Sequence, residues 1–205
     1  VDGIMHSCVD ALDDDMVKRI ADTGISLCPT LFLIECIMRG GEERFDQNLG
    51  YTRFVSKSHQ KDWHKYGEAY AVSDERVPPI SCGGMLKTKS AKEVQNTGRN
   101  LIKLRDAGVK IAFGSDAPYG CDQFGRPDDE LKAMQRAGLS MLECLRAATT
   151  GAASILGCTD RGEIVKGKRA DIIVVHSDMK ENAGDIEQIR DVIIAGRLLE
   201  DDPAR

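Results

Sequence analysis

Two polar side chains follow short apolar segments that are typical of buried parallel strands. Asp116 comes after the run 109–113, from which Gly114 and Ser115 separate it, and His6 comes directly after residues 1–5. Parallel α/β folds place their chemistry at the carboxyl ends of the strands. Carboxylates and imidazoles are both common ligands of divalent metal ions. The two strand ends together therefore suggest a metal site at the mouth of a barrel.

Each of these residues also has a structural interpretation. Asp116, after Gly-Ser, has the position of a turn aspartate that hydrogen-bonds its own backbone. His6 has the position of a buried histidine whose ring is satisfied by a backbone carbonyl. The local sequence around Asp116 does not separate the structural interpretation from the functional one.

The elements that would position these residues alternate between strand and helix, as in an α/β protein. Strands are expected at 1–5, 25–28 and 109–113. Helices are expected at 13–23, 31–38, 90–107, 128–137 and 140–156, and two of them begin with the spacing of a capping box. After Gly157 the pattern changes to a small β element, with a turn-rich β segment at 162–168, a strand at 170–175 and a strand pair around Ala195-Gly196.

These patterns divide the chain into two expected domains, an α/β part over 1–157 and a β part over 158–205. Residues 40–89 interrupt the first part with little strand pattern. Long irregular segments of this kind are usually loops that carry function. We therefore expect the segment 40–89 to be an insertion that shapes a substrate pocket.

Composition excludes several classes of protein. Of the 205 residues, 41% are hydrophobic and 30% are charged, which argues against disorder. The net charge of -5 argues against a nucleic-acid-binding surface. No apolar run approaches the roughly 20 residues that span a bilayer. The seven cysteines include no Cys-x-x-Cys pair, which favours reduced thiols and a cytoplasmic location.

Four pieces of sequence occur in an order that resembles a known family. They are DGIMH at 2–6, GISLCPTL at 24–31, GVKIAFGSD at 108–116, and TTGAASILG at 149–157 followed by GEIVKGKRAD at 162–171. The ordered set resembles the C-terminal half of a metal-dependent hydrolase of the amidohydrolase superfamily, in the imidazolonepropionase and Xaa-Pro dipeptidase-like branch. The resemblance implies the C-terminal part of a TIM (β/α)8 barrel, with its sixth, seventh and eighth strands, plus part of a small β-sandwich domain.

The resemblance also implies roles for the two polar residues. Asp116 would be a metal ligand that accepts a proton from the attacking water. His6 would bind a second metal ion, or contact the substrate in members that hold one ion. A divalent metal, expected to be zinc, would supply one or two ions to the complete enzyme and would lower the pKa of bound water from about 15.7 toward roughly 7.

The chain departs from the family in what it lacks. The family's His-x-His on the first strand, its lysine on the fourth and its histidine on the fifth have no counterpart here. We therefore expect a fragment, whose partner is the missing N-terminal half of the barrel in the same or another chain. Catalytic zinc sites take about three protein ligands, so the chain alone should bind metal weakly or not at all. Unpaired strand edges also make a homo-oligomer possible.

Other candidate residues have weaker support. Tyr119 and Arg126 follow Asp116 on the presumed eighth loop, and only this position suggests substrate contact. Cys8 and Cys28 lie near strand ends, where inert buried thiols are the favoured interpretation. The other three histidines favour structural interpretations, a solvated helix for two and the β element for the third: His59, His64 and His176.

The expected function is hydrolysis of a C–N bond in a cyclic amide, a dipeptide or a related small molecule through a metal-activated water. Its partners would be that substrate and the rest of the barrel, with no nucleic acid and no membrane. The alternative is a non-catalytic fragment or subunit that acts as an assembly or binding module, because the upstream metal ligands are absent.

Overall fold

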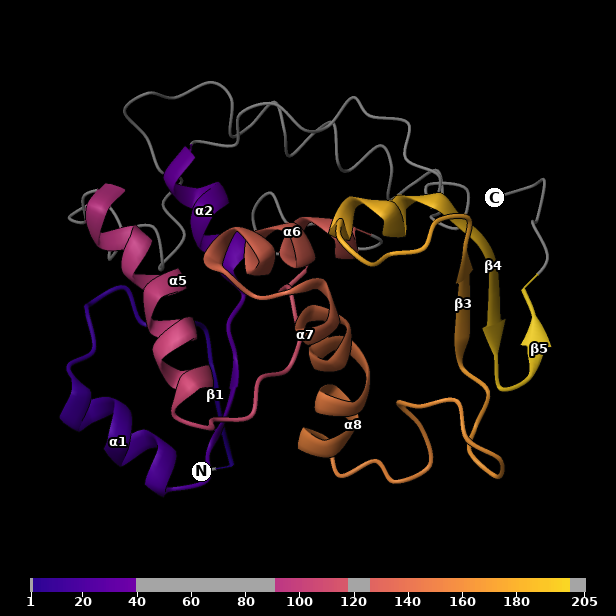
Figure 1. Ribbon diagram of the computed structural model, residues 1–205, viewed down its shortest axis with the longest axis horizontal. Helices are drawn as coiled ribbons and strands as arrows, with labels where there is room; N and C mark the ends of the chain where they lie inside the picture. Colours follow the sequence, from indigo (N-terminus) through magenta and orange to yellow (C-terminus); the bar gives the residue numbers. More distant parts are fainter. Residues whose placement is uncertain (1, 40–90, 118–125, 200–205) are drawn as a thin grey trace.

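The computed structural model describes residues 2–39, 91–117 and 126–199. The predicted insertion at 40–89, with His59 and His64, lies outside the described residues, as does Tyr119. Figure 1 shows the α/β part at one end of the long axis of the molecule and an antiparallel sheet at the other. Among the described residues no helix is long and apolar enough to cross a membrane.

The parallel strands of the α/β part are short. Strand β1 (Gly3–Met5) pairs in parallel with β2 (Ser26–Cys28), with Ile4 opposite Leu27. The segment 109–113 joins the other side of β2 through a parallel bridge between Leu27 and Ile111. Leu27 N donates to Lys110 O at 2.8 Å, and Ala112 N donates to Leu27 O at 2.8 Å. The expected third strand is therefore present only as this bridge.

Four helices surround these strands. Helix α1 (Asp14–Asp22) begins after Asp13, whose side chain accepts the Met16 N–H. Helices α2 (Leu31–Arg39), α5 (Ala91–Asp106) and α6 (Pro127–Ala137) contact one another, and α1 contacts α5. They bury a core with β2 that includes Leu27, Leu101, Leu131 and Met134. This core fixes the positions of the strand ends.

The helix predicted over 140–156 is divided. Helix α7 (Met141–Arg146) begins with the predicted capping box between Ser140 and Glu143. It continues as the π-helical segment η2 (Ala147–Gly151) and as α8 (Ala152–Ile155). The Ala147 carbonyl accepts the Phe113 N–H at 3.0 Å, so the widened turn lies where the helix contacts the third strand segment. The Phe113 N–H points away from β2, since the Ala112 N–H before it points toward β2. The ladder with β2 ends because Pro29, the next donor on that side, has no N–H.

The C-terminal part is one antiparallel sheet. Strand β4 (Ile189–Ile194) lies between β3 (Ile172–Val175) and β5 (Arg197–Leu198). The predicted strand pair is confirmed, because β4 and β5 form a hairpin around Ala195 and Gly196. The predicted β segment at 162–168 is wrong, since this stretch consists of turns and bends. The described residues hold this single sheet, and the second sheet of a sandwich stays a prediction.

The connection between β3 and β4 contacts the α/β part. Its 3-10 helix η3 (Ala183–Gln188) packs against α6. Gln135 on α6 makes two hydrogen bonds to this connection: its Nε2 donates to Glu181 O, and its Oε1 accepts the Ala183 N–H, both at 2.8 Å. The two parts are therefore joined by specific polar contacts as well as by apolar packing.

Candidate functional site

The carboxyl ends of the three parallel segments form one edge, which holds His6, Thr30 and Asp116. Backbone pairing continues past β1, because His6 N donates to Cys28 O and Ser7 N donates to Pro29 O, both at 2.9 Å. This pairing brings the chain after β1 beside the chain after β2. Asp116 follows the neighbouring segment 109–113 on the other side of β2. We call these three residues and their backbone the strand-end edge.

The backbone at the strand-end edge is unusual. His6, Thr30 and Asp116 have φ angles of 68°, 48° and 70°, in the left-handed region that residues other than glycine rarely adopt. They are three of the five non-glycine residues with positive φ in the described part of the chain. Such conformations cost free energy and cluster at functional sites. Their gathering at one edge singles out this place in the fold.

The imidazole of His6 is held by a hydroxyl. His6 Nδ1 lies 2.8 Å from Thr30 Oγ1, while the residue as a whole is exposed. The interpretation of His6 as a buried histidine bonded to a carbonyl is therefore wrong. The contact involves Nδ1, and Nε2 lies outside it.

Asp116 is also exposed, in contrast to the packed chain beneath it. The local turn contains a hydrogen bond in which Ser115 Oγ accepts the Ala117 N–H at 3.3 Å. A neighbouring serine thus makes the kind of turn contact expected of Asp116. The proposed role of Asp116 as a metal ligand stays a prediction, as does that of His6.

Cys28 is the last residue of β2, next to the strand-end edge, and its thiol is unreactive. Burial raises its thiol pKa to about 11, with smaller contributions from the negative charges of Glu130 and Asp116. A thiol with this pKa stays protonated near neutral pH and makes a poor nucleophile or metal ligand. Its sulfur lies so close to Gly114 that a Cβ added there would be 2.5 Å from Sγ. The half-buried Cys28 therefore fits the predicted packing role.

Glu130 belongs to the supporting structure and was not predicted from the sequence. It is fully buried, and its two carboxylate oxygens accept the first two N–H groups of α2, Leu31 N at 2.9 Å and Phe32 N at 2.6 Å. In the sequence it is the third acidic residue at the start of a helix, where carboxylates are favoured by that helix's own dipole. The sequence pattern does not show that the Glu130 carboxylate binds the amides of a different helix.

The neighbours of Glu130 form ion pairs, one fully buried and one partly exposed. Arg126 Nε lies 2.8 Å from Asp129 Oδ2, and both side chains are almost fully buried. This placement does not support the predicted substrate contact of Arg126. Lys132 pairs with Asp128 at 2.9 Å and also with Glu187 near η3. Burial alone would lower the pKa of Lys132, but its hydrogen bonds to the two carboxylates raise it on balance.

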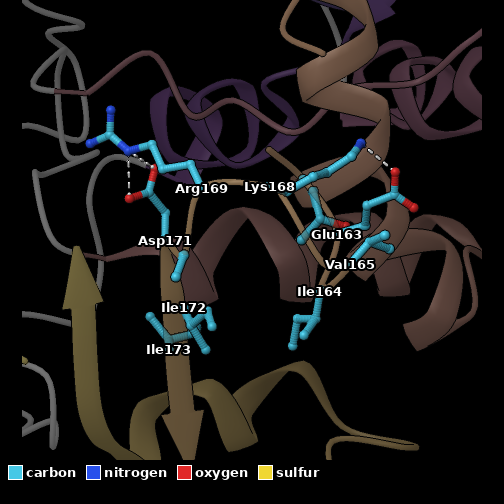
Figure 2. Close-up of a pocket in the computed structure, with 11 residues that line it drawn as sticks. Glu163, Ile164, Val165, Lys168, Arg169, Asp171, Ile172 and Ile173 are labelled. Carbon is cyan, nitrogen blue, oxygen red and sulfur yellow. Dashed lines mark hydrogen bonds and ion pairs between the residues drawn. The ribbon is translucent and has the colours of Figure 1, made fainter. Parts of the chain in front are cut away.

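The remaining candidates lie elsewhere. Cys8 is exposed. The His176 N–H donates to Gln188 O at 2.9 Å, as expected of a residue that belongs to the β part. A separate hollow of about 250 Å³ lies between the turns at 162–171 and the edge of β3. Figure 2 shows aliphatic side chains and the ion pairs of Lys168 and Arg169 around it, and no predicted site residue lines it.

The donors at the strand-end edge have the chemistry that a divalent metal requires, but they are few. His6 offers an imidazole nitrogen and Asp116 a carboxylate, which suit zinc. Among the described residues there is no group of three or more histidine, cysteine, aspartate or glutamate side chains that could hold an ion. A third protein ligand would have to come from outside the described residues.

Comparisons with known proteins support the fold and the family. The Amidohydrolase family matches residues 58–199, so the chain belongs to this family. The imidazolonepropionase of Deinococcus deserti is 38% identical over 103 residues, which are 48% of this chain and 25% of that protein. The probable imidazolonepropionase of Homo sapiens is 31% identical over 137 residues, which are 62% of this chain and 32% of that protein.

A solved structure extends the likeness over nearly the whole chain. A Xaa-Pro dipeptidase with bound methionine in its active site superposes with a TM-score of 0.64 at 24% identity, over 98% of this chain and 40% of the other. The likeness indicates a TIM-barrel-type fold, of which the described residues form an α/β portion. The chain spans between a quarter and a third of the two curated relatives named above. It is an imidazolonepropionase-like member of the amidohydrolases.

Proposed function

We propose that this chain is the C-terminal portion of a metal-dependent hydrolase that cleaves a C–N bond in a small cyclic amide. The observation that carries the proposal is the strand-end edge, where an exposed imidazole and an exposed carboxylate follow strand segments on either side of β2. Membership in the Amidohydrolase family supports the reaction class. The domain division at 157/158 and a cytoplasmic location complete the proposal.

The substrate class rests on the sequence relatives. Imidazolonepropionases are the relatives with at least 30% identity named above, whereas the dipeptidase likeness falls below 25% and concerns the fold. We therefore favour a cyclic amide over a dipeptide.

The residues at the strand-end edge would have different roles in the reaction. A divalent ion, zinc in this proposal, supplies a Lewis acid and lowers the pKa of water when bound. Asp116 would hold the ion and accept the proton of the attacking water, since its carboxylate is exposed at the rim. His6 would present Nε2 to the ion or to the substrate carbonyl, because Nδ1 is engaged by Thr30.

The rest of the barrel would complete the ligand set. Among the described residues β1 pairs with β2 alone, and Gly3 and Met5 are exposed. We propose that the N-terminal half of the barrel, in the same or another chain, covers the free side of β1. Self-association of the completed enzyme is a further proposal. A non-catalytic module is not favoured, because the chain matches the Amidohydrolase family and the two curated relatives are named as imidazolonepropionases.

The test uses the polypeptide that carries the remaining barrel strands together with this chain. We expect Asp116→Asn to lower kcat by about 10²- to 10⁴-fold on five-membered cyclic amides, the range typical of a lost general base. The measurements are hydrolysis rates for cyclic amides and Xaa-Pro dipeptides, together with metal content.

The control is Asp22→Asn, which removes an exposed carboxylate of α1 paired with Lys18 and should leave kcat unchanged. Full activity of Asp116→Asn would reject its role as base. Turnover of dipeptides in preference to cyclic amides would reject the substrate class.

A further inference from the structure

We propose that Thr30 is a positioning residue for His6, and that Glu130 acts through helix α2 to hold Thr30 in place. In this arrangement the Thr30 hydroxyl oxygen accepts the Nδ1–H of His6, so the Nε2 lone pair is free at the strand-end edge. The inference rests on the proposed function and selects one of its alternatives: an unprotonated Nε2 would bind a metal ion, since it has no hydrogen to donate to a substrate carbonyl.

The contact between the two side chains joins an exposed ring to a buried anchor. Thr30 Oγ1 lies 2.8 Å from His6 Nδ1, and Thr30 itself has no exposed surface. A neutral imidazole carries one N–H. If that hydrogen is on Nδ1, where Thr30 Oγ1 accepts it, Nε2 is unprotonated. The hydrogen bond at one ring nitrogen therefore determines what the other can do.

The backbone of Thr30 has a strained conformation that its surroundings maintain. Its φ of 48° is in the left-handed region, which is strained for a β-branched residue. Both flanking peptide groups are bound: the Pro29 carbonyl accepts the Ser7 N–H at 2.9 Å, and the Leu31 N–H donates to Glu130 Oε1 at 2.9 Å. These contacts maintain the backbone turn at Thr30, the residue whose hydroxyl meets His6.

Glu130 connects this turn to the core. Its second carboxylate oxygen accepts the Phe32 N–H at 2.6 Å, so one buried side chain of α6 binds the first two amides of α2. The N-terminus of a helix favours a negative charge, and the buried carboxylate gains two charge-assisted hydrogen bonds there. The contacts run from α6 through Glu130 to α2, then to Thr30, and finally to His6.

The first experiment reads the tautomer of His6 in the 205-residue chain by long-range ¹H–¹⁵N correlation NMR. The chain has four histidines, so the signals can be assigned with His6→Gln. The spectra are recorded about two pH units above the ordinary imidazole pKa of about 6.5. We expect the Nδ1–H tautomer to predominate. If the Nε2–H form predominates instead, the inference is overturned.

Two matched substitutions separate the hydroxyl from the shape of the side chain. Thr30→Val keeps the β-branched shape and removes the hydroxyl, and we expect it to abolish the preference for Nδ1–H. Thr30→Ser restores the hydroxyl and should restore the preference. The control Thr23→Val removes a hydroxyl that donates to Ile20 O and accepts the Ile25 N–H after α1, and it should leave the His6 tautomer preference unchanged. An unchanged tautomer in Thr30→Val would refute the role of Thr30.

The contribution of Glu130 is tested by Glu130→Gln, which places an amide donor where a carboxylate oxygen accepts an N–H. We expect hydrogen exchange of the Leu31 and Phe32 amides to accelerate by at least tenfold and the His6 tautomer preference to weaken. The control is Glu35→Gln on the same helix α2, where the carboxylate pairs with Arg136. Exchange as slow as in the unmodified chain, or an unchanged tautomer preference, would remove Glu130 from the inference.

Zinc affinity of the completed enzyme gives an independent measurement. Loss of a partner that orients a ligand typically lowers metal affinity 10- to 100-fold. We expect a decrease in that range for Thr30→Val and recovery for Thr30→Ser; equal affinity in Thr30→Val would contradict the inference. Neither measurement requires turnover, so a completed enzyme that binds zinc but hydrolyses no cyclic amide would reject the proposed function alone.

Discussion

The strand-end edge and the C-terminal hairpin both contain non-glycine residues in the left-handed region, but they sustain them differently. At the edge, Thr30 is fixed by contacts with chain segments far away in sequence, from Ser7 to Glu130. In the hairpin, Ala195 is followed by Gly196, and φ angles of 50° and 78° are what a two-residue turn with this twist requires. The same backbone geometry is imposed by tertiary structure in one region and by local structure in the other.

The charges of the two regions differ in the same way. Glu130 is buried and binds two backbone amides of another helix. Glu163 in the C-terminal part is exposed and pairs with Lys168 only five residues away. Because screening by water weakens exposed ion pairs and leaves buried contacts strong, equal substitutions in the two regions should have unequal effects.

The largest expected effect comes from Glu130→Ala. This substitution leaves two buried amides without their acceptor, at a cost of about 1–3 kcal/mol each, so we expect about 2–6 kcal/mol of lost unfolding free energy in total. Glu163→Ala should cost about 0–1 kcal/mol, as is usual for an exposed pair. Urea-induced unfolding, followed by circular dichroism, gives both values. Equal costs for the two substitutions would break the contrast between the regions.

A smaller effect is expected at Gly114, where the obstacle is a side chain. A Cβ there would lie 2.5 Å from Cys28 Sγ, so Gly114→Ala should destabilise the chain by about 1–3 kcal/mol through overpacking. At Gly167 nothing lies within 4 Å, but φ is 94°, so Gly167→Ala should cost about 1 kcal/mol through backbone strain.

A second substitution separates these two causes. In a double-mutant cycle, Cys28→Ala should offset most of the cost at Gly114, because it removes the atom that the new Cβ would meet. No substitution at another residue should rescue Gly167→Ala, since its cost lies in its own backbone. Additive costs of Gly114→Ala and Cys28→Ala in unfolding experiments would show that the close approach to the sulfur is not the obstacle.

Much of the fold could be predicted because its signals are local. The capping box at Ser140 and the turn residues Ala195-Gly196 each act within a few positions of the chain, and both predictions are confirmed. The segment 109–113 was predicted as a full strand from its apolar run, yet it makes one bridge, because the next donor toward it after Leu27 would be Pro29, which has no N–H. Tertiary structure decides that this run lies opposite Leu27 and Pro29, so no local pattern predicts it.

The residues of the candidate site differ in the same way: some have a local signal in the sequence and others do not. His6 and Asp116 could be singled out because each follows a strand-like run, which is visible in the sequence alone. Thr30 and Glu130 could not, because their importance comes from partners 24 and about 100 positions away. The sequence does not distinguish a buried glutamate from a solvent-exposed one on a helix. The packing of α6 against α2 is what makes Glu130 buried.

The smallest expected effect is a gain in stability at the hairpin. Ala195 has a φ of 50°, and asparagine tolerates this region better than alanine, particularly before glycine in a two-residue turn. Ala195→Asn should therefore stabilise the chain by about 0.5–1 kcal/mol. The backbone N–H of residue 195, which donates to Asp171 Oδ1 at 2.8 Å, is retained in the variant.

Ala11→Asn is the matched control, because Ala11 is exposed and its φ is not positive; its unfolding free energy should change by less than about 0.5 kcal/mol. The same unfolding experiment measures both variants. A loss of stability in Ala195→Asn would mean that contacts beyond the turn hold Ala195, as they hold Thr30. The hairpin would then resemble the strand-end edge, and the distinction between locally and tertiarily imposed backbone strain would not apply to this chain.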